Sequence, residues 1–334
     1  MGDLWRYSSS TEIPELKKAS FNLKIFVKQL LGLLVLVGAA YYMYQHLSHF
    51  QSWPRLNFRT IAPLIIISVA FQLFQSLIFK YQTELFNLKL SAKHWIGLSA
   101  TAALYNLVFP ARGGLIARAY FLQKKYQFPY SNYAGMMLIT LFVAFIATAG
   151  TSIAANGWSY LSLGTFNEAT LGVGLMAFLG SIIAFLVLAF FPKEKISSLV
   201  IKWPKLNSLW SGFVASTDLL HANRGGFLPL MLSFLGTIIF MAARLSFSGK
   251  LVELDIPLQS CFIIQTMVGL SVFVSFTPGN LGVKEGIIIA LLSSQNVSPE
   301  TAILVAGIDR LSSAFVVLAL GIPFHFLLIR DREL

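Results

Sequence analysis

The hydrophobic positions of this chain fall into long apolar runs that are separated by short polar stretches. A transmembrane helix needs about 20 mainly apolar residues. The runs of that length are residues 24–47, 60–82, 130–155, 169–191, 227–247 and 299–328. We therefore predict an all-α polytopic membrane protein with about six full spans.

Two further apolar runs are interrupted by residues that end helices. Residues 94–126 are broken at Pro110-Ala111-Arg112-Gly113-Gly114, and residues 258–295 are broken between residues 277 and 286. Proline and clustered glycines disfavour a continuous helix. Non-helical backbone at membrane depth is tolerated only where protein buries it or water reaches it. We therefore predict two re-entrant hairpins whose tips line a cavity and form the functional site.

The polar segments between the runs differ in charge. We interpret residues 1–23 as a cytoplasmic tail. Residues 156–168 contain no Lys or Arg, which predicts a loop on the outside of the membrane. Residues 193–224 carry five basic residues, together with apolar residues at helical spacing. This pattern predicts a cytoplasmic amphipathic helix at the membrane surface.

The distribution of Lys and Arg predicts a topology with both termini in the cytoplasm. On this topology hairpin 94–126 enters from the cytoplasmic side and hairpin 258–295 enters from the outside. Two spans, a hairpin and a span then recur in opposite orientation. Residues 24–155 form the first repeat, residues 156–192 supply a connecting loop and the next span, and residues 225–330 complete the second repeat. Inverted repeats with interrupted helices are typical of transporters.

Composition narrows the class of protein. The 334 residues are 56% hydrophobic and only 12% charged, with a mean hydropathy of +0.71, so we expect any chemistry to lie in or at the bilayer. Cys261 is the single cysteine, so an intramolecular disulfide is impossible. The five histidines form no metal-binding motif, and the chain contains no P-loop. We therefore expect no metal and no other cofactor.

The net charge of +11 changes this picture only slightly. A basic protein can bind nucleic acid, but here the basic residues flank the apolar runs, as the positive-inside rule requires. Arg118 can belong to this flanking set. We therefore expect membrane lipids as partners and no nucleic acid, because basic clusters beside a membrane attract anionic headgroups. Enzymes of envelope biosynthesis are further candidate partners, and the oligomeric state stays open.

Charged and polar residues gather at the two tips and in the last span. The candidate binding residues are Asn106, Arg112, Arg118, Asn280, Lys284, Glu285, Asp309 and Arg310. The residues expected to shape the tips are Pro110, Gly113, Gly114, Pro278, Gly279 and Gly282. A charge at the centre of a lone transmembrane helix costs about 2.5–3.5 kcal/mol. Several such charges imply a polar cavity or mutual pairing.

The residue types at these positions favour an anionic ligand. The guanidinium of arginine binds phosphate oxygens in a forked geometry, and helix starts next to glycine expose unpaired N–H groups. We expect Arg112, Lys284 and Arg310 to bind a phosphate headgroup. Glu285 and Asp309 would balance those positive charges or exchange a proton.

Structural roles are the alternative for each of these charges. Glu285 can pair with its neighbour Lys284, with Arg310 or with the arginine of the first tip, and so hold the hairpins together. Asp309 and Arg310 can each form an ion pair with a different partner, because adjacent residues on a helix diverge. We interpret Arg244 as a residue near a span end whose side chain reaches the membrane surface.

Both tips resemble motifs of a known family, the transmembrane, flippase-like domain of lysylphosphatidylglycerol synthases and its stand-alone relatives. Residues 277–286, T-P-G-N-L-G-V-K-E-G, are similar to the family motif T-P-G-G-L-G-V-R-E-G. Residues 110–120 are similar to its P-G-R-x-G-E-x-x-R-A-Y motif. Asp309-Arg310-Leu311 with downstream Pro323 resembles its Y-R-L pattern in the last span. The resemblance extends from about residue 20 to residue 328.

The resemblance implies translocation of a lipid, either an aminoacylated or glycosylated phospholipid or a polyprenyl-phosphate carrier. The chain departs from the family at Leu115, where the family usually has Glu. An acidic group that would help to bind or release a cationic headgroup or a proton is therefore missing, which argues against an aminoacylated substrate. Because no aminoacyl transferase domain follows the last span, we expect no synthesis by this chain.

Together these observations predict a non-enzymatic lipid translocase in the cytoplasmic membrane of a prokaryote. Its expected substrate is an anionic, phosphate-containing lipid, either a phospholipid or a polyprenyl-phosphate-linked lipid. One alternative is a membrane-embedded enzyme or synthase subunit that acts on a lipid phosphate. Another is a secondary transporter of a small anion, because the same cationic cavity would suit it.

Overall fold

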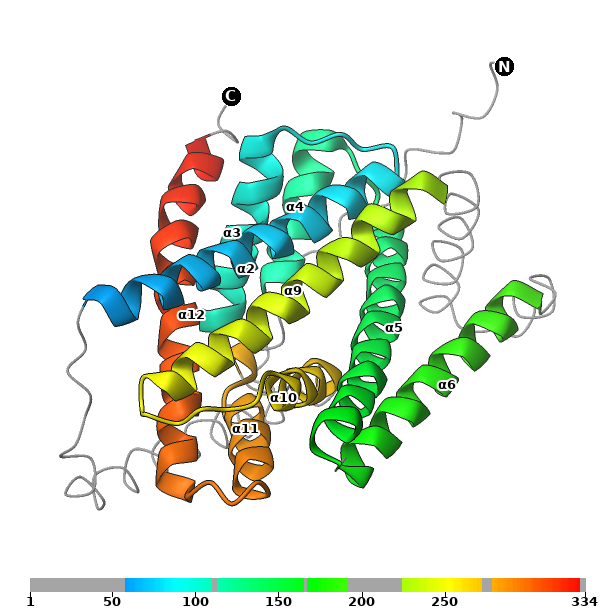
Figure 1. Ribbon diagram of the computed structural model, residues 1–334. Coiled ribbons are helices and arrows are strands. Elements are labelled where there is room, and N and C mark those ends of the chain that lie inside the picture. Colours follow the sequence, from blue (N-terminus) through cyan, green and yellow to red (C-terminus); the bar gives the residue numbers. More distant parts are fainter. Residues whose placement is uncertain (1–57, 110–112, 165–166, 191–223, 272–277, 331–334) are drawn as a thin grey trace, which may run out of the picture.

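The computed structural model describes residues 58–109, 113–164, 167–190, 224–271 and 278–330, and within these ranges all regular secondary structure is helical (Figure 1). The helices are α2 (Phe58–Leu85), α3 (Ala92–Val108), α4 (Gly113–Tyr126), α5 (Tyr130–Leu163), α6 (Glu168–Phe190), α9 (Arg224–Lys250), α10 (Leu258–Leu270), the short 3-10 helix η3 (Pro278–Asn280), α11 (Val283–Ser293) and α12 (Pro299–Arg330). The predicted tail 1–23, the predicted span 24–47 and the amphipathic segment up to residue 223 lie outside the described residues.

Four of the described helices, α2, α5, α9 and α12, are long and apolar enough to cross a membrane. Apolar side chains also point away from the protein along the outer face of α12, where Leu311 and Phe326 are 68% and 66% exposed. Such a face suits contact with lipid tails. The chain is therefore a helical membrane protein, as predicted, while the total of six spans stays a prediction.

One predicted boundary is wrong. Residues 156–168 were expected to form a loop, but α5 continues through this stretch to Leu163. The helix tolerates Asn156 because its buried side chain donates to the carbonyl of Ser152 and accepts from the hydroxyl of Thr170 on α6. It ends where Gly164 adopts the left-handed conformation common at helix ends, with a φ of 69°.

Contacts between the helices fall into corresponding pairs. α2 and α9 lie side by side through the middle of the molecule (Figure 1). α3 packs against α12, and correspondingly α10 packs against α5. α12 also contacts α2, and α5 contacts α9. These contacts of the α2–α5 part thus have counterparts in the α9–α12 part, as a pair of repeats related by a two-fold axis would require.

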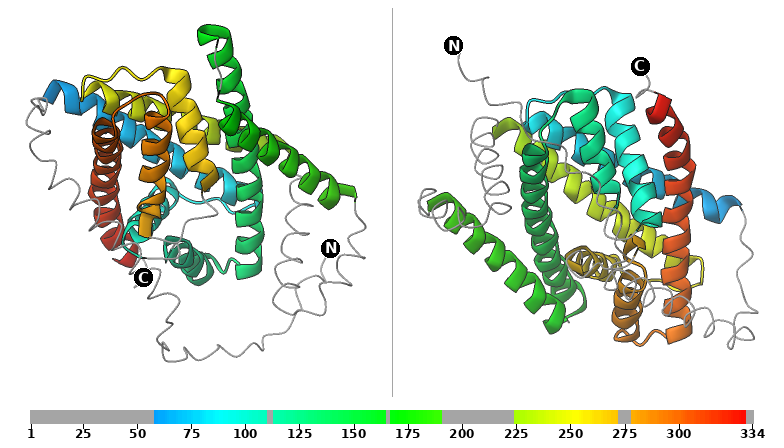
Figure 2. Two further views of the ribbon diagram at one scale, coloured as in Figure 1. Left: turned by 90° about the horizontal axis from the view of Figure 1, so that it is seen from below. Right: turned by 180° about the vertical axis from the view of Figure 1, so that it is seen from behind.

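Each part contains one pair of short helices, and the two pairs occupy opposite ends of the molecule. α3 and α4 lie at the upper end and α10 and α11 at the lower end (Figures 1 and 2). η3, which precedes α11, contacts α3, so the second pair reaches the first. Entry of these hairpins into the membrane from opposite faces stays a prediction.

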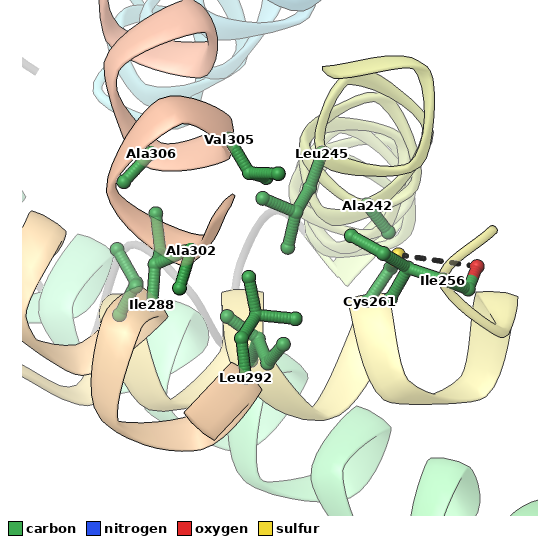
Figure 3. Packing of buried hydrophobic residues seen from close by; sticks show 11 residues of the cluster. Ala242, Leu245, Ile256, Cys261, Ile288, Leu292, Ala302, Val305 and Ala306 are labelled. Atoms are coloured by element: carbon green, nitrogen blue, oxygen red, sulfur yellow. Dashed lines mark hydrogen bonds between the residues drawn. The ribbon is translucent and has the colours of Figure 1, made fainter. Parts of the chain in front are cut away.

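A buried apolar cluster joins the second hairpin to α9 and α12 (Figure 3). On α12 the cluster includes Ala302, Val305 and Ala306, which share one face of the helix. Asp309 continues that face one turn further, because positions i, i+3, i+4 and i+7 lie on one stripe. Packing of small and aliphatic side chains thus turns the only carboxylate of this face toward α9 and α11.

Candidate functional site

Asp309 is the centre of a buried ion network that joins three helices. Its side chain is fully buried, and its Oδ1 accepts a hydrogen bond from Nε of Arg244 on α9 at 2.7 Å. Its Oδ2 accepts a second from Nζ of Lys284 on α11 at 2.6 Å. A buried carboxylate is tolerated when it is paired and hydrogen-bonded in this way. Asp309 therefore fixes the start of α11 relative to α9.

The position of Arg244 overturns our interpretation from the sequence. Its side chain is 1% exposed and points into the protein, rather than toward the membrane surface. The guanidinium also lies 5.1 Å from the ring centroid of Phe71 on α2. The signal available in the sequence was a positive charge, Arg244, in one apolar run and a negative charge, Asp309, in another.

Arg310 clamps the second tip onto α12. Its NH1 donates to the carbonyl of Gly279 at 2.8 Å and lies 3.3 Å from Oε1 of Glu285. The other carboxylate oxygen of Glu285 accepts from the backbone N–H of Gly282 at 2.7 Å, which caps the start of α11. Of the three partners considered for Glu285 from the sequence, Arg310 is the one with which the structure pairs it. This pair is partly exposed, with 17% of the Arg310 side chain and 20% of the Glu285 side chain accessible.

The backbone of the second tip turns through three left-handed residues. Gly279, Asn280 and Gly282 have φ values of 58°, 57° and 85°. Glycine adopts this region without strain, and asparagine does so more readily than most residues. A Cβ at Gly279 would also lie 2.6 Å from NH2 of Arg310. Asn280 donates to the hydroxyl of Ser271 at 3.2 Å, which ties the tip to the end of α10.

The first tip is held by a close backbone contact. A Cβ on Gly114 would overlap the carbonyl oxygen of Ala102, so glycine is required for α4 to lie against α3. Oδ1 of Asn106 accepts from the N–H of Gly114 at 2.9 Å. Gly113 begins α4, whereas the predicted tip residues Pro110 and Arg112 lie outside the described residues.

A cavity of about 340 Å³ lies between the two tips. Its walls come from α2, α3, α4, α9, η3, α11 and α12. Asn106 of the first tip and Gly279 of the second both border it. Its volume falls in the range of about 300–1,000 Å³ that is usual for ligand sites. The structure therefore brings the predicted tips together around one cavity.

Among the residues that the structure describes, four cations line this cavity: Arg118, Arg244, Lys284 and Arg310. The guanidinium of Arg118 stacks over the ring of Phe79, with 4.1 Å between the guanidinium carbon and the ring centroid. Arg118 thus lies between helices and lines the cavity, whereas the sequence also allowed it to be a charge that only flanks the hairpin. Asn106, another of the predicted binding residues, also lines the cavity. Glu285 and Asp309 do not line it but form ion pairs with the cations that do.

Sequence reasoning missed four uncharged polar residues of the cavity: Gln72 and Gln75 on α2, Ser99 on α3 and Ser313 on α12. Gln72 is only 4% exposed and its amide nitrogen has no hydrogen-bond partner among the described residues. Two amides three residues apart in an apolar span face the same way, and this spacing could have identified them. Nowhere in the described part of the chain do three or more His, Cys, Asp or Glu side chains gather closely enough to hold a metal ion.

The unpartnered polar atoms of the cavity share one property. Among the lining residues that the structure describes, every buried side-chain atom without a hydrogen-bond partner is a nitrogen, including NH1 of Arg244 and NH2 of Arg310. Buried donors without partners are costly, so a ligand that supplies acceptor oxygens would stabilise the site. The arrangement is suited to binding an anion.

Comparison with known proteins places these elements in a family. No protein with a curated description matches the chain. A family model described as the lysylphosphatidylglycerol synthase TM region matches residues 29–321, a range that contains both hairpins and the cavity between them. The chain therefore belongs to the lysylphosphatidylglycerol synthase TM region family, whose name points to a membrane protein that handles lipids.

Proposed function

We propose that this protein is a translocase that moves an anionic, phosphate-containing lipid across the cytoplasmic membrane of a prokaryote. The lipid would be a phospholipid or a polyprenyl-phosphate-linked lipid. Membership of the family supports a role in lipid handling. The observation that carries the proposal is the cationic cavity that both hairpins border.

The cost of building this cavity in a membrane protein supports a ligand-binding role. Charges at membrane depth are expensive, and the ones that persist commonly mark substrate pathways. Asp309 and Glu285 offset part of that cost, but the described network leaves donor atoms of Arg244 and Arg310 unused. Phosphate oxygens are strong acceptors and match the forked donors of arginine.

In this proposal the lipid tails remain in the bilayer while the headgroup crosses through the cavity. Lys284 and Arg310 bind the phosphate, and Asp309 and Glu285 balance their charge. Both carboxylates already accept hydrogen bonds from cations or from a backbone N–H, which favours binding over general-base catalysis. We therefore propose a non-enzymatic role.

The test is headgroup movement in proteoliposomes. The full chain would be reconstituted with fluorescent phospholipids and polyprenyl phosphates, and movement of the label would be followed with a membrane-impermeant quencher. The wild type should move an anionic phosphate lipid. Lys284→Gln, which removes a cation from the cavity, should slow this movement by about tenfold or more.

Lys250→Gln is the matched control, because Lys250 is exposed at the end of α9 and does not line the cavity. Circular dichroism and gel filtration would establish that both variants are folded. Movement that is equally fast in Lys284→Gln would remove this residue from the mechanism. If folded wild-type protein moves no lipid, the translocase proposal fails, and uptake of inorganic phosphate or conversion of the lipid would then identify the anion transporter or enzyme alternatives.

A further inference from the structure

The charges around the cavity do not balance. Four positive side chains line it, and two carboxylates, Asp309 and Glu285, pair with three of them. These six described groups therefore carry a net charge of +2. Asp309 is shared between Arg244 and Lys284, so one carboxylate serves two cations. Arg118 rests on the ring of Phe79, a contact that stabilises a cation without neutralising it.

The side chains that carry this surplus of positive charge are largely buried. Arg244 is 1% exposed, and the side chains of Lys284 and Arg310 are 12% and 17% exposed. Interactions between charges strengthen as water is excluded, and an uncompensated charge becomes more costly. A bound anion with two negative charges would neutralise the group, whereas an anion with one charge would leave a cation unbalanced.

Phosphate esters differ in this respect. A phosphomonoester carries about −1.5 to −2 charges at pH 7, because its second pKa lies near 6. A phosphodiester, the linkage in most phospholipids, carries a single negative charge. An aminoacylated phospholipid adds positive charge to that phosphodiester. Of these three headgroups, that of the aminoacylated phospholipid would therefore be the worst electrostatic match for this cavity.

We propose that the cavity selects lipids whose headgroup ends in a phosphomonoester, which carries close to two negative charges, over lipids that contain only a phosphodiester. This inference rests on the proposed lipid-binding function and narrows its substrate class. The unused nitrogens of Arg244, Arg310 and Gln72 supply donors for the oxygens that a terminal phosphate leaves free. A terminal phosphate has three such oxygens, and a phosphodiester has two.

Binding of short-chain lipids to the full-length protein in non-ionic detergent tests this selection. Dioctanoyl phosphatidic acid provides a phosphomonoester and dioctanoyl phosphatidylglycerol a phosphodiester on the same tails. Isothermal titration calorimetry at about pH 8 should give an affinity at least about tenfold higher for the phosphomonoester. At about pH 5 the phosphomonoester loses one charge, so the preference should shrink to less than about threefold.

The phosphodiester measured at both pH values controls for titration of the protein. A change in the protein's own charge between the two pH values would alter binding of both lipids, whereas loss of charge from the phosphomonoester changes only one of them. The ratio of the two affinities therefore isolates the effect of the ligand's charge from that of the protein's charge.

Two substitutions alter the charge surplus in opposite directions. Lys284→Gln lowers the net charge to one positive unit and should reduce the preference for the phosphomonoester, whereas Lys250→Gln at the exposed end of α9 should leave it unchanged. Glu285→Gln raises the surplus and should strengthen binding of the phosphomonoester. Equal affinities for the two wild-type ligands at about pH 8 would overturn this selection while leaving lipid binding intact. If neither lipid binds, both the selection and the proposed function are overturned.

Discussion

The two hairpins occupy corresponding places in the fold but are held by different forces. The first, formed by α3 and α4, contains no carboxylate among its described residues and is fixed by the contact of Gly114 with Ala102 and by aromatic packing around Phe121. The second, formed by α10, η3 and α11, is fixed by ion pairs of Lys284 and Glu285 to α12.

Within one site, the first hairpin is thus positioned by the fit of its backbone and the second by its charges. Close backbone packing gives the first hairpin a position that does not depend on the ligand. Ion pairs give the second hairpin contacts for which an anionic ligand can compete, since the same cations face the cavity. We infer that the second hairpin responds to the headgroup, while the first provides a rigid wall.

Breaking the centre of the second hairpin's ion network should have the largest effect. Asp309→Asn leaves Arg244 and Lys284 buried without a countercharge, a change that typically costs about 3–5 kcal/mol. Chemical unfolding in detergent micelles, followed by tryptophan fluorescence, would measure this loss. Asp255→Asn is the control, because it makes the same chemical change in an exposed loop. It should alter the free energy of unfolding by no more than about 0.5 kcal/mol. Comparable stability of the two variants would contradict the assigned role of Asp309.

A smaller loss is expected from the shape of the first hairpin. Gly114→Ala places a methyl group against the carbonyl of Ala102, and such overpacking typically costs about 1–3 kcal/mol. Gly286→Ala on α11 is the matched control, since no atom lies within 4 Å of the position of the added Cβ. The same unfolding experiment should show no loss for Gly286→Ala. An undisturbed Gly114→Ala protein would mean that α4 can move away from α3 at little cost.

The partly exposed pair of the second hairpin should contribute least to stability. Glu285→Gln keeps an oxygen for the N–H of Gly282 and removes only the charge that faces Arg310, so the expected loss is about 1 kcal/mol or less. Glu285→Ala removes the cap as well and should cost about 1 kcal/mol more. Equal losses for both variants would assign the effect to the ion pair and would argue against the helix cap.

Several features of this protein follow from local sequence. The apolar runs predict the spans, because a bilayer requires about 20 apolar residues whatever the tertiary fold. The broken helices at residues 110–114 and 277–286 follow from proline and glycine, whose backbone preferences act within a few residues. Charge in the second break identified Lys284 and Glu285 as candidates for the site, and charge within the last apolar run identified Arg310.

Other features depended on which helices are neighbours. Arg244 was misassigned because its partner Asp309 lies on another helix, and no local pattern pairs the two residues. The spacing of Gln72 and Gln75 marks one polar face of α2, but only the placement of α2 against α9 and α3 shows that this face lines the cavity. The boundary of α5 was missed for the same reason, since Thr170 of α6 supplies a partner for Asn156.

The sequence by itself determined that this is a helical membrane protein with two interrupted hairpins, because hydrophobic length and backbone propensity are local properties. Only the tertiary structure decided that both tips border one cavity and that its cations outnumber its carboxylates. Electrostatic balance is a sum over residues from four helices, α4, α9, α11 and α12, and their distances are set by packing rather than by sequence separation. The class of ligand that we propose therefore rests on a charge balance that no single segment of the chain contains.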